Sequence, residues 1–111
     1  MTILDLSGMR AYLDGDKEEE REIVQVFVNK ATKDLGQIES SIGAGTLDDW
    51  QESCHSLKGS AALLGAFVLR DICHEGEVMT VCDAAAQKDF LARMQQAYDE
   101  VVSVLAEEDL L

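Results

Sequence analysis

The sequence contains no proline and few basic side chains. Nine of its 111 residues are Lys or Arg and 22 are Asp or Glu, which gives a formal net charge of −13. The absence of proline removes the commonest helix breaker and favours long helices. The negative charge argues against a surface that binds nucleic-acid phosphates, and equally against one that docks on anionic lipid.

Long apolar runs are also missing. No stretch of about 18 consecutive apolar residues occurs, which excludes a membrane-spanning segment. Residues 1–5 lack the basic start and the small-residue cleavage site of a secretory signal. Cys54, Cys73 and Cys82 are odd in number and form no Cys-x-x-Cys pair. We interpret them as reduced thiols packed in the core of a cytoplasmic protein, rather than as disulfides or zinc ligands.

The chain has the size and composition of one small globular domain. Hydrophobic residues make up 47% and charged residues 28% of the sequence, proportions typical of a folded protein rather than of a disordered tail. A single domain over residues 1–111 has an expected radius of gyration of roughly 13 Å. This length excludes a barrel enzyme, and also a dinucleotide-binding domain with a separate substrate domain.

Apolar residues recur at intervals of three and four along most of the chain, which is the period of amphipathic helices. No strand-like alternation of useful length interrupts them. The pattern predicts a short helix and four longer ones, at about 5–13, 16–42, 46–64, 66–82 and 87–107. The expected fold is therefore all-α: an antiparallel up-down four-helix bundle with a short extra N-terminal helix.

Polar residues predict where two of these helices begin. Asp16 has Glu19 three residues further on, and the pair is typical of a helix N-terminus with a capping box. Thr46 with Asp49 offers a second N-terminal cap, directly after the glycine-rich turn at 43–45. These signals predict the starts of the helices at about 16–42 and 46–64.

The segment 46–64 carries an unusual group of residues around His55. At about 100° per residue, Lys58, Gly59 and Ala62 fall within about 60° of His55 on the helix surface. The apolar stripe of the segment centres more than about 100° away, and it consists of Trp50, Cys54, Leu57, Ala61 and Leu64. We therefore expect His55 on the solvent side, with a lysine on one flank and little side chain around it.

This grouping suggests phosphoryl chemistry. A glycine in mid-helix, such as Gly59, costs about 1 kcal/mol relative to alanine, but it leaves bare backbone on which another protein can land. A neutral imidazole is a nucleophile, and a lysine one turn away can pair with a phosphoryl oxygen as a point charge. The residues predict that His55 accepts a phosphoryl group from a bulky donor.

In chain order the group reads His55-x-x-Lys58-Gly59-Ser60, followed by Gly65-Ala66 and Leu69. This pattern resembles the signature of histidine-containing phosphotransfer (HPt) domains, and the resemblance covers nearly the whole chain. It implies that an aspartyl phosphate of a response-regulator receiver domain phosphorylates His55 on Nε2. The phosphoryl group would then pass from His55 to an aspartate of another receiver.

The resemblance also implies roles for the neighbouring residues. Lys58 would steady the phosphoryl oxygens, while Gly59 and Ala62 would form the surface that a receiver approaches. Gly65 would allow a close crossing of the helices at 46–64 and 66–82. The family often places a glutamine or glutamate against the other imidazole nitrogen, and counting without gaps puts Glu77 there.

Three positions depart from the family pattern or stay unplaced. Gly76 stands where the family usually has an apolar residue, so it either loosens the helix before Glu77 or permits a closer contact. Cys54 stands where a small residue is common. Arg70 is a further basic residue on the following helix, and its position relative to His55 does not follow from the sequence.

The resemblance further implies what the protein takes from its partners. The sequence has no glycine-rich phosphate loop of the Gly-x-x-x-x-Gly-Lys type, so we expect a phosphotransfer protein without kinase or ATP-binding activity of its own. A receiver domain would supply the acidic pocket, the Mg²⁺ and the acyl phosphate. The expected partners are response-regulator receivers, including one within a hybrid sensor histidine kinase, and the protein itself would be a monomer.

Two alternatives to this shuttle remain open. One is the phosphotransfer domain of a chemotaxis-type histidine kinase, in which an ATP-bound kinase domain phosphorylates His55. The start at Met1 and the end after the last predicted helix favour a stand-alone shuttle. The other is a non-catalytic helical-bundle adaptor that binds receivers, against which the presence of both His55 and Lys58 argues.

A metal-binding bundle is the weakest interpretation. Di-metal bundles use two inward-facing Glu-x-x-His pairs with a glutamate from each remaining helix. Glu52 and His55 have this spacing, but both fall on the solvent face. Asp71 and His74 repeat the spacing with the wrong acid. We expect no metal site and interpret His74 as an ordinary structural histidine.

Overall fold

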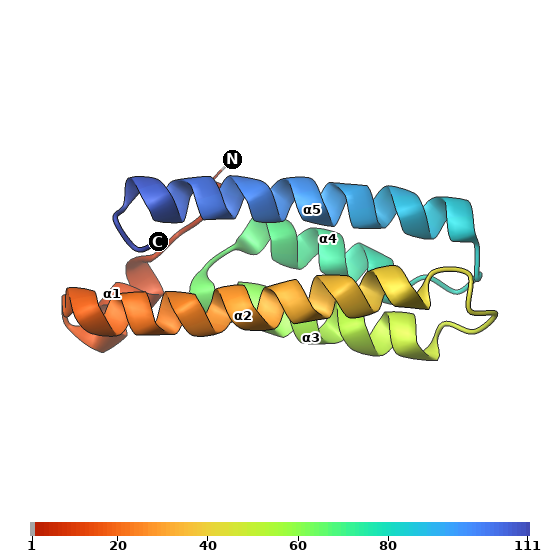
Figure 1. Ribbon diagram of the computed structural model, residues 1–111, viewed down its shortest axis with the longest axis horizontal. Helices are drawn as coiled ribbons and strands as arrows, with labels where there is room; N and C mark the ends of the chain where they lie inside the picture. Colours follow the sequence, from red (N-terminus) through yellow and green to blue (C-terminus); the bar gives the residue numbers. More distant parts are fainter. Residues whose placement is uncertain (1) are drawn as a thin grey trace.

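The part of the chain that the structure describes contains five helices and no strand. The structure is a computed structural model, and it describes residues 2–111. The helices are α1 (Ser7–Leu13), α2 (Lys17–Ser41), α3 (Asp48–Leu64), α4 (Phe67–Glu77) and α5 (Ala84–Glu107) (Figure 1). The prediction of an all-α protein is confirmed.

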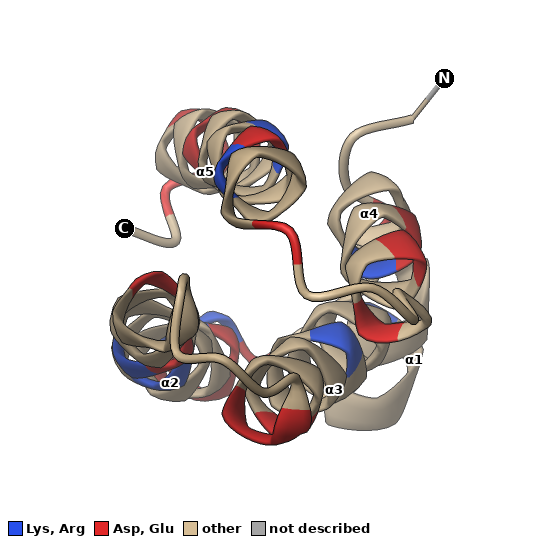
Figure 2. Ribbon diagram, turned by 90° about the vertical axis from the view of Figure 1, so that its right-hand side faces the viewer, with Lys and Arg blue, Asp and Glu red and all other residues tan. Residues whose placement is uncertain are grey.

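The helices form an elongated bundle. Seen from the end, α2, α3, α4 and α5 surround a common interior, and α1 lies at the far end (Figure 2). α3 packs against both α2 and α4, and α5 closes the other side through contacts with α4 and α2. The bundle measures 46 × 24 × 19 Å, and its radius of gyration of 14.4 Å exceeds the expectation because the molecule is elongated.

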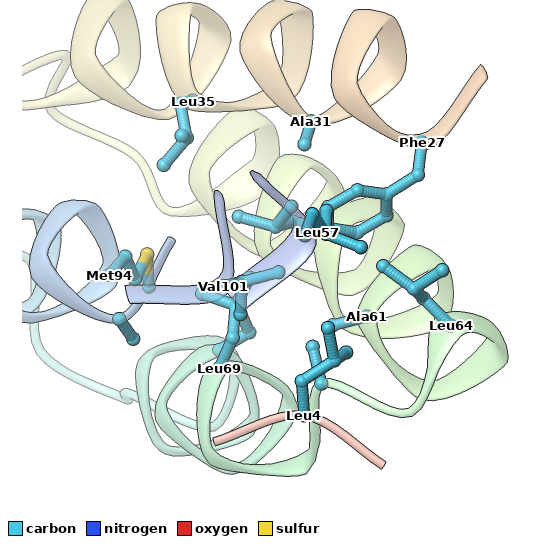
Figure 3. Packing of buried hydrophobic residues seen from close by; sticks show 14 of the residues in the cluster. Leu4, Phe27, Ala31, Leu35, Leu57, Ala61, Leu64, Leu69, Met94 and Val101 are labelled. Atoms are coloured by element: carbon cyan, nitrogen blue, oxygen red, sulfur yellow. The ribbon is translucent and has the colours of Figure 1, made fainter. Parts of the chain in front are cut away.

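The interior is filled by the apolar stripes that the sequence predicts. Leu57, Leu69 and Met94 come from three different helices and meet in the core (Figure 3). Burial of such side chains is the main stabilising contribution to the bundle. Ile23, which lies beside Val24 of the buried stripe of α2, is 39% exposed.

One of the two predicted helix caps is present. The side chain of Asp16 accepts a hydrogen bond from the backbone N–H of Glu19 at 3.1 Å, at the start of α2. The prediction of a cap at Thr46 is wrong, because α3 begins at Asp48 and is preceded by Leu47. Leu47 packs against the core, and its carbonyl oxygen accepts the first helical hydrogen bond, from Gln51 at 2.8 Å.

The helix predicted at 66–82 ends five residues earlier, at Glu77. The apolar residues beyond that point, Val78 and Val81, are 56% and 69% exposed, so tertiary packing does not extend the helix. The helix predicted from 87 starts earlier, at Ala84. There the Asp83 side chain accepts hydrogen bonds from the N–H groups of Ala85 and Ala86, which caps the helix.

Gly65 ends α3 with a backbone that only glycine adopts readily. Its φ angle is +98°, and a Cβ atom there would lie 1.8 Å from the carbonyl oxygen of Asp5. The Asp5 N–H donates to the Gly65 carbonyl at 2.9 Å. The close approach at Gly65 is therefore made by the N-terminal segment, and not, as we expected, by a crossing of two bundle helices.

The cysteines divide into two groups. Cys54 and Cys73 are buried in the core, as predicted, but Cys82 is exposed because it lies in the connection between α4 and α5. None of the helices found in residues 2–111 is long and apolar enough to cross a membrane.

Candidate functional site

His55 projects from the outer face of α3. Its side chain is 70% exposed, whereas Cys54 and Leu57 beside it are completely buried. The apolar stripe turns one side of α3 to the core, so a residue on the opposite side of the helix faces solvent. This position agrees with the angular count from the sequence.

Glu77, the last residue of α4, lies against the imidazole of His55. The distance from Glu77 Oε1 to His55 Nδ1 is 2.7 Å, and the Glu77 side chain is 20% exposed. An ionised carboxylate only accepts hydrogen bonds, so Nδ1 carries the proton. In the neutral ring Nε2 then keeps its lone pair and is the nucleophilic nitrogen.

Lys58 approaches the other oxygen of the same carboxylate. Lys58 Nζ lies 2.5 Å from Glu77 Oε2, and the lysine side chain is 25% exposed. Burial of Glu77 opposes its ionisation, but Lys58 and His55 outweigh this effect and hold the pKa of Glu77 below its ordinary value. One ionised carboxylate therefore joins the two residues that the sequence analysis assigned to phosphoryl transfer.

Gly76 explains how α4 brings this carboxylate so close. A Cβ atom at Gly76 would lie 3.0 Å from Met94 Cε and 3.4 Å from Trp50 Cζ2. The Trp50 indole N–H donates to the Gly76 carbonyl at 2.8 Å. The missing side chain lets α4 pack directly on α3, one residue before Glu77. Of the two interpretations open for Gly76, the structure shows the closer contact.

The surface beside His55 is open. Gly59 and Ala62 are both exposed, and among the described residues no atom outside the helix itself would lie within 4 Å of a Cβ atom at Gly59. Leu63, which the sequence analysis did not single out, is 87% exposed. Ala62 and Leu63 line a shallow pocket of about 180 Å³ together with Gly8 of α1.

A second polar cluster, missed from the sequence, lies on the α2 side of His55. Ser56 donates from Oγ to Asp34 Oδ2 at 3.0 Å, and Lys30 Nζ lies 3.1 Å from the same oxygen. The Asp34 side chain is only 5% exposed. In the sequence, Asp34 stands between Ala31 and Leu35 on the buried stripe of α2, and this position could have indicated that its side chain is buried. The cluster fixes α3 to α2 next to His55.

Two further residues of α4 differ in their relation to the site. The guanidinium of Arg70 lies 4.5 Å above the Phe67 ring and pairs with Asp71 at 2.8 Å. His74 is one turn before Glu77, and its Nδ1 lies 3.9 Å from Glu77 Oε2. Residues 2–111 bring no group of three or more His, Cys, Asp or Glu side chains together in a way that could hold a metal ion.

The family model described as Hpt domain matches residues 22–106, which include all of α3 and α4 and most of α2 and α5. No significant similarity was found to a curated protein or to a solved structure. The fold and the match together define a phosphotransfer module of two-component signalling. The chain belongs to the Hpt domain family; these domains are phosphotransfer modules distinct from kinase domains, and they interact with response-regulator receiver domains in phosphorelays.

Proposed function

We propose that the protein is a phosphorelay intermediate in which His55 is the phosphoacceptor. His55 receives the group from an aspartyl phosphate of one receiver domain and passes it to an aspartate of another. The strongest support is the setting of His55: its side chain is 70% exposed, and Nδ1 is held by Glu77 at 2.7 Å. This setting leaves Nε2 as the nitrogen for attack.

The transfer balances with the groups present. The Nε2 lone pair forms the bond to phosphorus as the bond from phosphorus to the aspartyl oxygen breaks, and the aspartate leaves as a carboxylate. The proton on Nδ1 stays there, and the ionised Glu77 stabilises the positive charge that develops on the ring. The positive charge of Lys58 balances the negative charge of the phosphoryl oxygens. The second transfer reverses these steps, and both depend mainly on positioning.

The proposed partner surface surrounds His55. The antiparallel four-helix bundle of α2 to α5 supplies a rigid support, while Gly59 and Ala62 admit the active-site loops of a receiver. Exposed Leu63 adds apolar contact area. The interface is modest and transient, because a shuttle must release each partner. The receiver brings the Mg²⁺, and the shuttle works in the cytoplasm as a monomer.

The test is incubation with a receiver domain that carries radiolabelled aspartyl phosphate. Label should appear on this chain as an adduct that is labile in acid and stable in base. His55→Gln should abolish labelling, whereas Glu100→Gln, an exposed acid of α5, should leave it unchanged. Equal labelling of His55→Gln would overturn the assignment. A panel of phosphorylated receivers, including those of hybrid sensor histidine kinases, then ranks the partners by transfer rate.

A further inference from the structure

The two oxygens of the Glu77 carboxylate are satisfied to different degrees. Oε1 lies 2.7 Å from His55 Nδ1 in a hydrogen bond. Oε2 is covered from solvent and receives no hydrogen bond of good geometry from the described residues. Lys58 Nζ, 2.5 Å away, therefore balances its charge as an ion pair. A covered carboxylate oxygen without a partner is strongly unfavourable.

Phosphorylation makes a competing demand on Lys58. A phosphoryl group on His55 Nε2 brings two negative charges to the side of α3 on which Lys58 lies, and a lysine pairs readily with phosphoryl oxygens. If Lys58 turns to that group, Oε2 of Glu77 loses the cation that balances it. The carboxylate then needs another donor if it is to stay ionised against His55.

His74 is the donor in place for this exchange. Its Nδ1 is 3.9 Å from Oε2, on the same helix and three residues before Glu77. Its side chain is 60% exposed, so the ring has room to turn. A movement of about 1 Å would bring Nδ1 within hydrogen-bond distance. Either the neutral ring protonated on Nδ1 or the imidazolium can donate.

We propose that His74 is a positioning residue that replaces Lys58 on Glu77 when Lys58 turns to the phosphoryl group. Glu77 thereby remains ionised and keeps Nδ1 of phosphorylated His55 in place. The proposal rests on the proposed function, because the exchange takes place in the phosphorylated state. It goes beyond it by giving a role to a histidine that the transfer chemistry itself does not use.

One test needs no phosphorylation. Lys58→Ala leaves Oε2 without its cation, so His74 should already bind Glu77 in the resting protein. Ring nitrogen-15 NMR of His74 should show Nδ1 becoming a hydrogen-bonded donor in Lys58→Ala and not in Lys58→Ala with Glu77→Gln. Unchanged His74 signals in Lys58→Ala would overturn the proposal, whatever the outcome of receiver labelling.

The second test measures the equilibrium of the phosphoryl group between a receiver and this chain. His74→Ala should shift it toward the receiver by about 3- to 10-fold, on the scale of one hydrogen bond to a charged group. His74→Gln, which keeps a donor, should recover most of the loss. In the Lys58→Ala background His74→Ala should have no effect, because His74 then binds Oε2 in both states. An equal effect in both backgrounds overturns the proposal, and absence of label on wild-type His55 overturns the proposed function instead.

Discussion

The indole of Trp50 is hydrogen-bonded to the backbone carbonyl of Gly76, one residue before the carboxylate that contacts His55. Trp50 is completely buried and belongs to α3, as His55 does. The bond therefore connects the helix that carries the proposed phosphoacceptor to the helix that carries its carboxylate partner. The hydrogen bond from Trp50 to Gly76 is thus part of the core packing and also helps to place Glu77 against His55.

Trp50→Phe should test this connection. The substitution removes the indole donor and leaves the Gly76 carbonyl only the longer bond from the Met79 N–H at 3.3 Å. The free energy of unfolding, measured by urea denaturation, should therefore fall by about 0.5–1.5 kcal/mol for the lost hydrogen bond. Phosphoryl transfer to His55 should slow as well, because Glu77 is held less firmly. Tyr98→Phe removes only a hydroxyl 3.5 Å from Thr32 and should do neither. A Trp50→Phe variant with wild-type transfer would contradict the connection.

Gly59→Ala should make the protein more stable. Among the described residues nothing outside the helix stands within 4 Å of a Cβ atom there, so alanine gains its helix propensity, about 0.5–1 kcal/mol, without a clash. Gly36→Ala in α2 has the same open surroundings and is the matched control. Both should raise the midpoint of urea denaturation.

Only the position beside His55 should affect transfer. Gly59→Leu should slow labelling by a phosphorylated receiver at least about tenfold, because the larger side chain blocks the approach; this corresponds to about 1.4 kcal/mol in the barrier. Gly36→Leu should transfer at the wild-type rate. Equal rates for the two leucine variants would show that Gly59 does not serve access.

Glu77 predicts a pH dependence of stability. Its pKa is lowered in the folded protein, since burial, which alone would raise it, is outweighed by Lys58 and His55. The stabilisation is therefore fully present above the ordinary glutamate pKa and is lost as pH falls through the lower folded value. The difference in unfolding free energy between wild type and Glu77→Gln should be constant near neutrality and shrink in that acid range. A difference that grows on acidification would show that the pKa is raised.

The three thiols should differ in reactivity. Burial raises the pKa of the Cys54 thiol to about 12 and raises that of Cys73 as well, and the thiolate is the reactive form. Cys82 is exposed. Native protein treated with iodoacetamide at neutral pH should gain one adduct by mass spectrometry, at Cys82, and three in urea. Rapid native modification of Cys54 would contradict the burial.

The sequence allowed the orientation of His55 to be predicted, because a continuous apolar stripe fixes which side of α3 faces the core. The spacing to Glu77 followed from counting, since the turn at Gly65 holds the register between α3 and α4. The burial of Asp34 could have been predicted from its place on the apolar stripe of α2, but its pairing with Ser56 could not, because that depends on how α2 and α3 are aligned along each other. The approach of His74 to Glu77 follows from their i,i+3 spacing on α4, but it gained significance only once Glu77 was seen to contact His55.

The contact between Gly65 and Asp5 shows a similar limit. A glycine after a helix predicts a turn, and its positive φ angle agrees with that. Which segment packs against the bare backbone depends on the path of the chain before α1. Asp5 is 60 residues away in sequence and belongs to no helix, so local patterns carried no information about it.

Glu77 is the final residue of α4, and an irregular segment follows it. Helix ends open locally with far less free energy than the core requires to unfold. Each such opening would detach the carboxylate from His55 while α3, anchored in the core by Trp50, keeps the imidazole in position. The bond from Trp50 to Gly76 opposes this opening, so the lifetime of the assembled site should depend on that bond, and hydrogen exchange at the end of α4 would report it separately from the global stability of the bundle.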